Sequence, residues 1–293
     1  MPRPLPPLAL IALGGALAGC TVGPQDASKD AAPVIDAAPD AIDAPPPGPL
    51  VFVLAGESNS GGIALNSEAT EAELAPRPSV QIMDLYSGAF GFEPLDIGYN
   101  NLVDHEGLSN NTTYVPSLHD IRIHGMELGL ANAVEAGAFP GVTSVYLIKT
   151  GHGGSRIDQW GVGGTYWTKF LQRTDAAKLA LPADARWVVW YSQGINDAIA
   201  GVPIAAWKAG TVAHIAKVRA QLPGCQFIFT EFQSMPANAG YPAVNAAIRE
   251  LIAADPTLTS VDTTGAATDG ANHWSYAGYR NVVVPRMVAA THR

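Results

Sequence analysis

A serine, a histidine and an aspartate occupy positions from which they could carry out acyl transfer. Ser58 lies in a glycine-bearing turn, Gly56-Glu57-Ser58-Asn59, and His273 lies near the end of the chain, closely after Asp269. A serine hydroxyl is a weak nucleophile until a base takes its proton. Histidine is a base that works near neutral pH, and a carboxylate can hold its ring in the correct tautomer. We predict Ser58 as the nucleophile, His273 as its base and Asp269 as the residue that orients the base.

Acyl transfer also requires N–H donors directed at the oxyanion that develops on the substrate. The backbone amides of Ser58, Gly153 and Gly154 are candidates, together with the side chain of Asn196 or Gln193. A serine in a glycine-rich turn is most often only a turn residue, and each of these signals is weak by itself. Their order along the chain, each after a predicted strand, is what favours an active site.

Four other histidines are rival bases, and none of them has the late position in the chain that His273 has. They are His105, His119, His124 and His152. Of these, His124 is predicted to brace the loop behind the nucleophile together with Glu127. No spacing of His, Asp and Glu indicates a catalytic metal, so we expect no metal and no cofactor.

The polar turns follow short, continuous apolar runs, which are typical of strands buried on both faces of a parallel sheet. These runs are Leu50–Ala55, Val145–Ile148, Trp187–Tyr191 and Phe227–Thr230. One further strand is expected near Val80–Leu85, within a stretch of irregular loops from Ile63 to Leu118. In such sheets ligands bind beyond the carboxyl ends of the strands, so the polar turns should converge on one edge.

Helical patterns alternate with the predicted strands, which favours an α/β fold with a three-layer α/β/α, doubly wound parallel sheet. The predicted helices are Met126–Ala136, Ile204–Leu222, Val244–Ala254 and Tyr276–Ala290. Pro285 should kink or interrupt the last of them, because proline cannot donate the helical hydrogen bond.

Composition excludes several classes of protein. The chain has 293 residues, 47% hydrophobic and 15% charged, which is enough to form a sizeable core. Its formal net charge of −9 argues against a nucleic-acid partner, because phosphate binding needs a basic surface. Two cysteines are too few for a disulfide framework or a structural zinc site.

The first residues are typical of an export signal. Residues 1–20 combine a weakly basic start with an apolar run that ends in small residues. Residues 21–49 are rich in Ala, Asp and Pro, which favours an extended, disordered tether. We therefore divide the chain into a signal peptide (1–20), a tether (21–49) and one domain (50–293).

The ordered set of motifs resembles the SGNH (GDSL-like) hydrolases, and more closely their sialate O-acetylesterase-like branch, which includes acetylxylan esterases of carbohydrate esterase family six. The resemblance spans residues 51–285 and implies a flavodoxin-like SGNH hydrolase fold. The matching segments are Gly56-Glu57-Ser58-Asn59, His124-Gly125-Met126-Glu127, Ile148–Ser155 with Trp160 after it, and Trp190–Ile195. On this basis Asn59 and Trp160 are predicted to bind substrate.

The chain departs from that branch at three places. Glu57 replaces the usual Gln, and Ile195 replaces the usual Glu. The pair of Asp269 and His273 is separated by one residue more than usual. The extra residue is either absorbed in a turn or keeps Asp269 from reaching His273, which would leave a dyad or a backbone carbonyl as the orienting group.

The resemblance implies a serine esterase that removes short acyl groups, chiefly O-acetyl groups, from carbohydrate. Two alternatives remain open: a glycan-binding protein of the same fold without turnover, and an SGNH lipase or thioesterase. Leu17-Ala18-Gly19-Cys20 resembles a bacterial lipobox. It implies lipidation at Cys20 and a lipoprotein of the cell envelope, anchored in the outer membrane, whose contact with the membrane is through the lipid alone.

Overall fold

The computed structural model describes residues 48–85, 90–101, 123–233, 235–236 and 238–291. The predicted signal peptide, Cys20 and the tether up to residue 47 lie outside the described residues. The first strand begins at Gly48, so Gly48 and Pro49 belong to the sheet rather than to the tether to which they were assigned.

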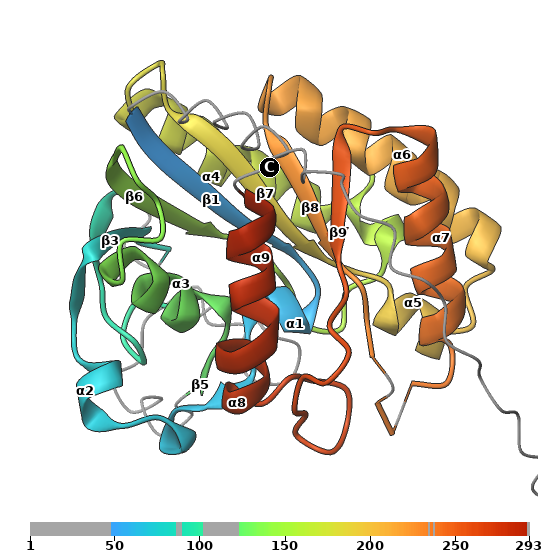
Figure 1. The fold of residues 1–293 in the computed structure, drawn as a ribbon. Helices are drawn as coiled ribbons and strands as arrows, with labels where there is room; N and C mark the ends of the chain where they lie inside the picture. Colours follow the sequence, from blue (N-terminus) through green and yellow to red (C-terminus); the bar gives the residue numbers. More distant parts are fainter. Residues whose placement is uncertain (1–47, 86–89, 102–122, 234, 237, 292–293) are drawn as a thin grey trace, which may run out of the picture. The chain divides into compact units, whose positions relative to one another are not determined.

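A seven-stranded sheet forms the centre of the described residues (Figure 1), in the order β4-β3-β6-β1-β7-β8-β9. Neighbouring strands are parallel except for β3 and β4. A separate antiparallel pair joins β2 to β5. The strands are β1 (Gly48–Gly56), β2 (Ala64–Leu65), β3 (Arg77–Met83), β4 (Phe92–Leu95), β5 (Ile123–His124), β6 (Val142–Lys149), β7 (Arg186–Ser192), β8 (Gln226–Thr230) and β9 (Leu258–Val261).

The topology confirms the predicted doubly wound α/β fold. Strands β6-β1-β7-β8-β9 have the flavodoxin-like order, and β3 and β4 extend the sheet beyond β6. The chain leaves β1 toward β6 on one side and later returns to β7 on the other side. The carboxyl ends of β1 and β7 therefore form the switch point at which doubly wound folds bind ligands.

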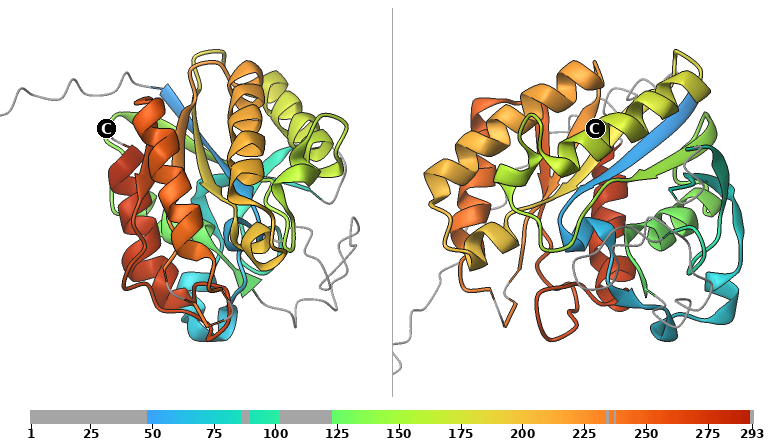
Figure 2. Two further views of the ribbon diagram at one scale, coloured as in Figure 1. Left: turned by 90° about the vertical axis from the view of Figure 1, so that its right-hand side faces the viewer. Right: turned by 180° about the vertical axis from the view of Figure 1, so that it is seen from behind.

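Helices cover both faces of the sheet: α3 and α9 lie on one face, and α4 and α6 lie on the other (Figures 1 and 2). None of the helices in the described ranges is long and apolar enough to span a bilayer. The α-helices are α1 (Ser58–Gly61), α2 (Glu71–Leu74), α3 (Met126–Glu135), α4 (Thr165–Ala180), α5 (Ile195–Ile199), α6 (Ile204–Gln221), α7 (Tyr241–Ala254), α8 (Tyr276–Gly278) and α9 (Val284–Thr291). Shorter turns are η1 (Asn66–Glu68), η3 (Ile157–Trp160) and the π-helical η4 (Tyr279–Val283).

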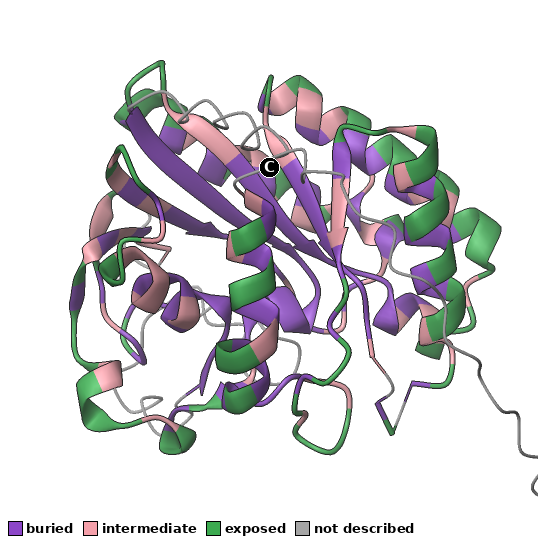
Figure 3. Ribbon diagram, viewed as in Figure 1, coloured by how far each residue is buried: buried purple, intermediate pink, exposed green. Residues whose placement is uncertain are grey.

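Strand β1 is the centre of the core, and all of its residues are buried (Figure 3). It pairs with β6 and β7 on its two sides, which places Phe52 beside Leu147 and Val188. The Phe52 ring packs edge-on against Trp190 at 4.9 Å between ring centroids. Because β1 is fixed on both faces and both edges, the residues directly after it have a well-defined position.

The last predicted helix is three elements rather than one. The chain forms α8, then the π-helical turn η4, and then α9, whose second residue is Pro285. Proline lacks the N–H that would bond back along an α-helix, and a π turn accommodates this missing donor. The expected interruption is therefore present, on the N-terminal side of the proline.

Helix α4 and strand β9 were not predicted. Helix α4 mixes Thr, Lys and Arg with aromatic residues and shows no regular apolar stripe. Strand β9 is a short edge strand in which only Leu258 and Val261 are buried. Both elements depend on tertiary packing more than on a local pattern.

Candidate active site

A tight turn places Ser58 at the carboxyl end of β1. Gly56 has a φ of +119°, and a Cβ atom there would lie 2.0 Å from the carbonyl oxygen of Ser192, so only glycine fits. The amide of Glu57 donates to that same oxygen at 2.8 Å. Ser58 then begins α1 and is 6% exposed. The predicted nucleophile thus lies at the switch point between β1 and β7.

The aspartate reaches the histidine despite the extra residue between them. His273 Nδ1 lies 2.8 Å from Asp269 Oδ2, and the amides of Ala271 and His273 donate to Asp269 Oδ1. The amide of Asp269 in turn donates to the carbonyl of His273. Gly270, with a φ of +84°, allows the chain to turn here. The extra residue is therefore absorbed in a closed turn.

The same contacts keep Asp269 ionised. Partial burial by itself raises the pKa of this carboxyl, but the hydrogen bonds from Ala271 and His273 outweigh burial and hold the pKa below its ordinary value. An ionised carboxylate beside Nδ1 places the ring proton on that nitrogen and leaves Nε2 as the basic atom. This is the arrangement that a general base requires.

Asn59 connects the serine turn to the histidine loop. Its Nδ2 donates to the carbonyl of Asn272 at 3.0 Å, and its Oδ1 accepts from the amide of Trp274 at 3.2 Å. Its own carbonyl accepts from the hydroxyl of Tyr279 at 2.9 Å. Residues next to Ser58 and on both sides of His273 are thereby joined, although they are far apart in the chain.

The predicted substrate contact by Asn59 is corrected by this geometry. The Asn59 side chain is 0% exposed, and its Nδ2 and its Oδ1 both bond to backbone groups of the histidine loop. It therefore positions other residues of the site and cannot contact a substrate in this structure.

Among the predicted oxyanion groups, the turn that contains Gly153 and Gly154 and the side chain of Asn196 are both bonded to residues at the end of β1. Gly153 and Gly154 lie in the turn after β6, and this turn is held against the end of β1 by the bond from the amide of His152 to the carbonyl of Gly56 at 2.9 Å. Asn196 is the second residue of α5, and one N–H of its side chain donates to Glu57 Oε2 at 2.6 Å. The second N–H of this amide has no partner among the described residues.

Gln193 is the predicted oxyanion donor that the structure does not support. Its Nε2 donates to the carbonyl of Ser155 at 2.9 Å and to Asp197 Oδ2 at 2.8 Å. Both N–H bonds of the amide are therefore occupied, and the side chain is 1% exposed. Gln193 instead joins the turn after β6 to α5.

Trp160 is also buried rather than available to substrate. Its side chain is 0% exposed, and its Nε1 donates to Ser155 Oγ at 3.2 Å. The aromatic residues that remain partly exposed beside the Gly153 turn are Tyr166 and His152, whose rings stack with centroids 4.1 Å apart. In the described part of the chain, these two rings are therefore the aromatic groups next to the Gly153 turn that keep some exposure.

The ion pair of Lys149 and Glu127 is buried behind the site, and no pattern in the sequence indicated it. Lys149 Nζ lies 2.8 Å from Glu127 Oε1, and both side chains are buried. The same carboxylate oxygen accepts from the amide of Gly125. Gly125 packs so closely on Gly62 at the end of α1 that neither could carry a side chain without a clash. Glu127 thus braces the loop behind the nucleophile, as predicted.

The two rival bases that the structure describes differ from His273 in their contacts. Burial lowers the pKa of His124 to about 4, and its Nδ1 contacts Asn66 Oδ1. The ring of His152 stacks on Tyr166, and its Nδ1 lies 2.8 Å from the carbonyl of Gly153. His105 and His119 lie outside the described residues. Within the described ranges, no group of three or more His, Cys, Asp or Glu side chains could hold a metal.

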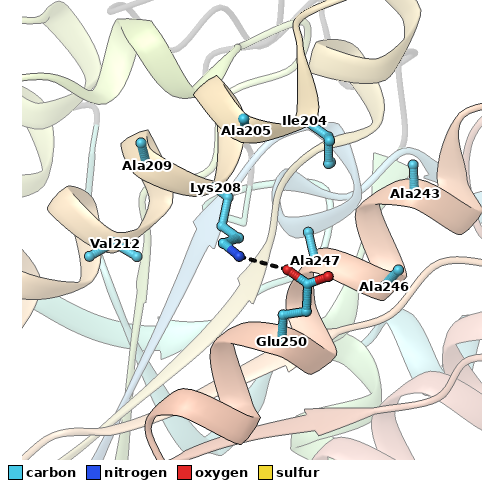
Figure 4. Close-up of a pocket in the computed structure, with 9 residues that line it drawn as sticks. All are labelled: Ile204, Ala205, Lys208, Ala209, Val212, Ala243, Ala246, Ala247 and Glu250. Carbon is cyan, nitrogen blue, oxygen red and sulfur yellow. Dashed lines mark hydrogen bonds and ion pairs between the residues drawn. The ribbon is translucent and has the colours of Figure 1, made fainter.

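A separate groove lies between α6 and α7 (Figure 4). It has a cavity volume of about 440 Å³ and is lined mainly by alanines, with the ion pair of Lys208 and Glu250 inside it. None of the candidate catalytic residues lines this groove. The candidate active site lies elsewhere, at the edge of the sheet formed by the ends of β1 and β7 and by the histidine loop.

Comparison with known proteins decides the family. Residues 49–290 match the family described as "Carbohydrate esterase, sialic acid-specific acetylesterase". The chain belongs to this family. It is accordingly a carbohydrate esterase, that is, a carboxylic ester hydrolase.

Solved structures show the same fold for this carbohydrate esterase. A protein from Arabidopsis thaliana has a TM-score of 0.59 at 17% identity, over 82% of this chain and 96% of that chain. The structure of NanS also has a TM-score of 0.59 at 17% identity, over 84% of this chain and 97% of that chain. No curated protein matches the chain.

Removing the side chain of Asn59 should impair catalysis more than folding. We expect Asn59→Ala to lower kcat by about a hundredfold, because the histidine loop then loses both of its bonds to the serine turn and a misplacement of about 1 Å has that effect. The measurement is steady-state hydrolysis of p-nitrophenyl acetate, with a circular dichroism spectrum as the folding control. An unchanged kcat would contradict this positioning role.

Breaking the buried ion pair should destabilise the fold. We expect Glu127→Gln to lower the free energy of unfolding in urea by about 3–5 kcal/mol, because Lys149 would remain charged and buried without its partner. The double variant Glu127→Gln/Lys149→Met is the control and should recover much of this loss. Equal stability of the wild type and the single variant would be inconsistent with the pair as described.

Proposed function

We propose that this carbohydrate esterase removes short acyl groups, chiefly O-acetyl groups, with Ser58 as nucleophile, His273 as general base and Asp269 as the orienting carboxylate. The observation that carries the proposal is the pair of bonds from Asn59 to the residues on both sides of His273. They support the proposal because they join the residue after Ser58 to the residues next to His273, while Asp269 contacts Nδ1 of the His273 ring.

In the acylation step, His273 Nε2 takes the proton of Ser58 Oγ as that oxygen attacks the ester carbonyl carbon. The resulting oxyanion is stabilised by the backbone amides of Ser58 and of Gly153 or Gly154, and by the second N–H of the Asn196 side chain. When the bond to the sugar oxygen breaks, His273 donates its proton to that oxygen, and the acyl group remains on Ser58.

Deacylation repeats these proton transfers with water in place of Ser58 as the attacking group. His273 takes a proton from water as the water oxygen attacks the acyl carbon, and Asp269 stabilises the imidazolium that forms. The bond between the acyl carbon and Ser58 Oγ then breaks, His273 returns the proton to Ser58, and the carboxylic acid leaves.

Two observations support a carbohydrate ester as the substrate: the family, and the aromatic residues beside the Gly153 turn. The family description names sialic acid-specific acetylesterases, which supports an O-acetylated sugar as substrate. The partly exposed stack of Tyr166 on His152, next to Gly153, supports contact with a sugar ring, since aromatic faces commonly line small-molecule sites.

The nucleophile is tested by a matched pair of serine variants in α1. We expect Ser58→Ala to lower acetate release from p-nitrophenyl acetate by at least about a thousandfold, because the acyl-enzyme can no longer form. Ser60→Ala is the control, since Ser60 Oγ only donates to the carbonyl of Glu57. Ser60→Ala should keep kcat within about tenfold of the wild type. Full activity in Ser58→Ala would refute the proposed nucleophile.

The same assay separates the proposal from its rivals. Release of acetate from an O-acetylated sugar, with little hydrolysis of long-chain esters, is expected for the acetylesterase. A preference for long acyl chains would assign the chain to the lipase or thioesterase alternative. Binding of a glycan without any release of acetate would support the binding-protein alternative.

We also propose that residues 1–20 direct export, that Cys20 carries the lipid anchor, and that residues 21–47 tether the domain to the outer membrane. The support is the Leu17–Cys20 segment and the composition of the residues after it. Expression with a labelled fatty acid should label the wild-type chain and leave Cys20→Ser unlabelled. Equal labelling of the two chains would rule out this anchor.

A further inference from the structure

Glu57 is the residue directly before the proposed nucleophile, and it is fully buried. Its carboxylate accepts three hydrogen bonds: Oε1 accepts from the amide of Ile195 at 2.8 Å, and Oε2 accepts from the amide of Asn196 at 2.9 Å and from Asn196 Nδ2 at 2.6 Å. All three contacting groups are N–H donors. The hydrogen bonds of this side chain thus favour the ionised carboxylate, whereas its burial opposes ionisation.

The groups around the Glu57 carboxylate do not include a cation among the described residues. Within the described residues, no Lys, Arg or His side chain forms an ion pair with Glu57. The titratable groups that face it are the carboxylate of Asp197, on α5, and the phenol of Tyr191, on β7. The pKa of Glu57 is raised to about 8, because burial and, to a smaller extent, the charge of Asp197 outweigh the three hydrogen bonds, which lower it.

The two protonation states of Glu57 satisfy these donors differently. The ionised carboxylate accepts from all three N–H groups at once. The neutral acid carries its proton on the lone-pair position of Oε1 that no donor occupies, so the three contacts can remain but lose the negative charge that strengthens them. Hydrogen bonds to an ionised acceptor are roughly twice as strong as those to a neutral one, so each donor is held more weakly. Two of the donors are backbone amides fixed in the turn into α5, so the Asn196 side chain is the group free to rotate away.

We propose that Glu57 is a positioning residue whose ionised carboxylate holds the Asn196 side-chain amide at the oxyanion site, so that full activity requires Glu57 to be ionised. This inference rests on the proposed function, in which Asn196 donates to the oxyanion. Glu57 touches no reacting atom and acts entirely through Asn196.

Stability and activity should then respond to pH in opposite directions. The folded state favours the neutral form of Glu57, so the stability it contributes is complete below the ordinary pKa of glutamate and is lost as the pH rises through about 8. Catalysis gains the ordered Asn196 amide over that same interval. The wild type should therefore become less stable and more active as this group ionises.

The main experiment compares the full-length wild type with Glu57→Gln, whose amide cannot ionise. The kcat for acetate release from p-nitrophenyl acetate is measured from about pH 6 to about pH 9.5. The wild-type profile should contain a rise near pH 8 that the variant lacks. Above that rise, kcat of the variant should be lower by about a hundredfold, with KM changed much less, since a misdirected oxyanion donor acts on the transition state.

Two further variants separate positioning from a general structural role. In an Asn196→Ala background, Glu57→Gln should lower kcat no further, because the group that Glu57 positions is absent. Asp197→Asn should move the rise in kcat to lower pH, because a neighbouring negative charge that opposes ionisation is removed. Additive losses in the double variant would overturn the inference.

Thermal unfolding over the same pH range is independent of activity. The melting temperature of the wild type should fall as the pH passes about 8, and that of Glu57→Gln should not. If the wild type and Glu57→Gln are both active with identical pH profiles, the inference is overturned and the proposed function stands. If the folded wild type releases no acetate, the proposed function fails, and the inference fails with it.

Discussion

The site depends on one side-chain amide that joins two distant segments of the chain. Asn59 Nδ2 donates to the carbonyl of Asn272, and Asn59 Oδ1 accepts from the amide of Trp274. These two residues lie on either side of His273. A buried amide with both ends satisfied is held firmly, because each lost bond would leave a polar group without water. The serine comes from the first turn after the central strand, and the base comes from the last loop before α8. The Asn59 contacts therefore join the segment of the proposed nucleophile to the segment of the proposed base.

Several features around the site restrict its geometry at some cost in stability. Glu57 is a buried carboxyl group that forms no ion pair with any described residue, and Lys149 with Glu127 is a buried ion pair. Buried charges are expensive and are weak evidence for stability, but they restrict the arrangements that a site can adopt. Gly56, with its left-handed φ and its contact with Ser192, restricts the turn in the same way. The edge of the sheet is thus rigid where the proposed chemistry takes place.

Much of this architecture could be predicted from the sequence, because parallel strands buried on both faces give continuous apolar runs. Those runs located β1, β6, β7 and β8, and with them the edge that carries Ser58. The Asp269–His273 contact was left open, because whether an extra residue fits in a turn depends on backbone angles at Gly270. Helix α4 and strand β9 were missed because their patterns are irregular.

The errors at the site have a common physical cause. Asn59, Trp160 and Gln193 are polar or aromatic residues in the expected motifs, and each was interpreted as facing substrate or the oxyanion. In the structure all three point into the protein and bond to its own groups. A sequence shows which residue types follow a strand, but it does not show which of them are buried by neighbouring loops.

The most direct test of the central claim is covalent labelling with a fluorophosphonate, followed by peptide mass spectrometry. The reagent reacts with a serine only where a base activates the hydroxyl and an oxyanion site accepts the phosphoryl oxygen. We expect a single adduct on Ser58 in the wild type and its loss in His273→Ala. An adduct on another serine, or labelling of Ser58 that persists without His273, would contradict it.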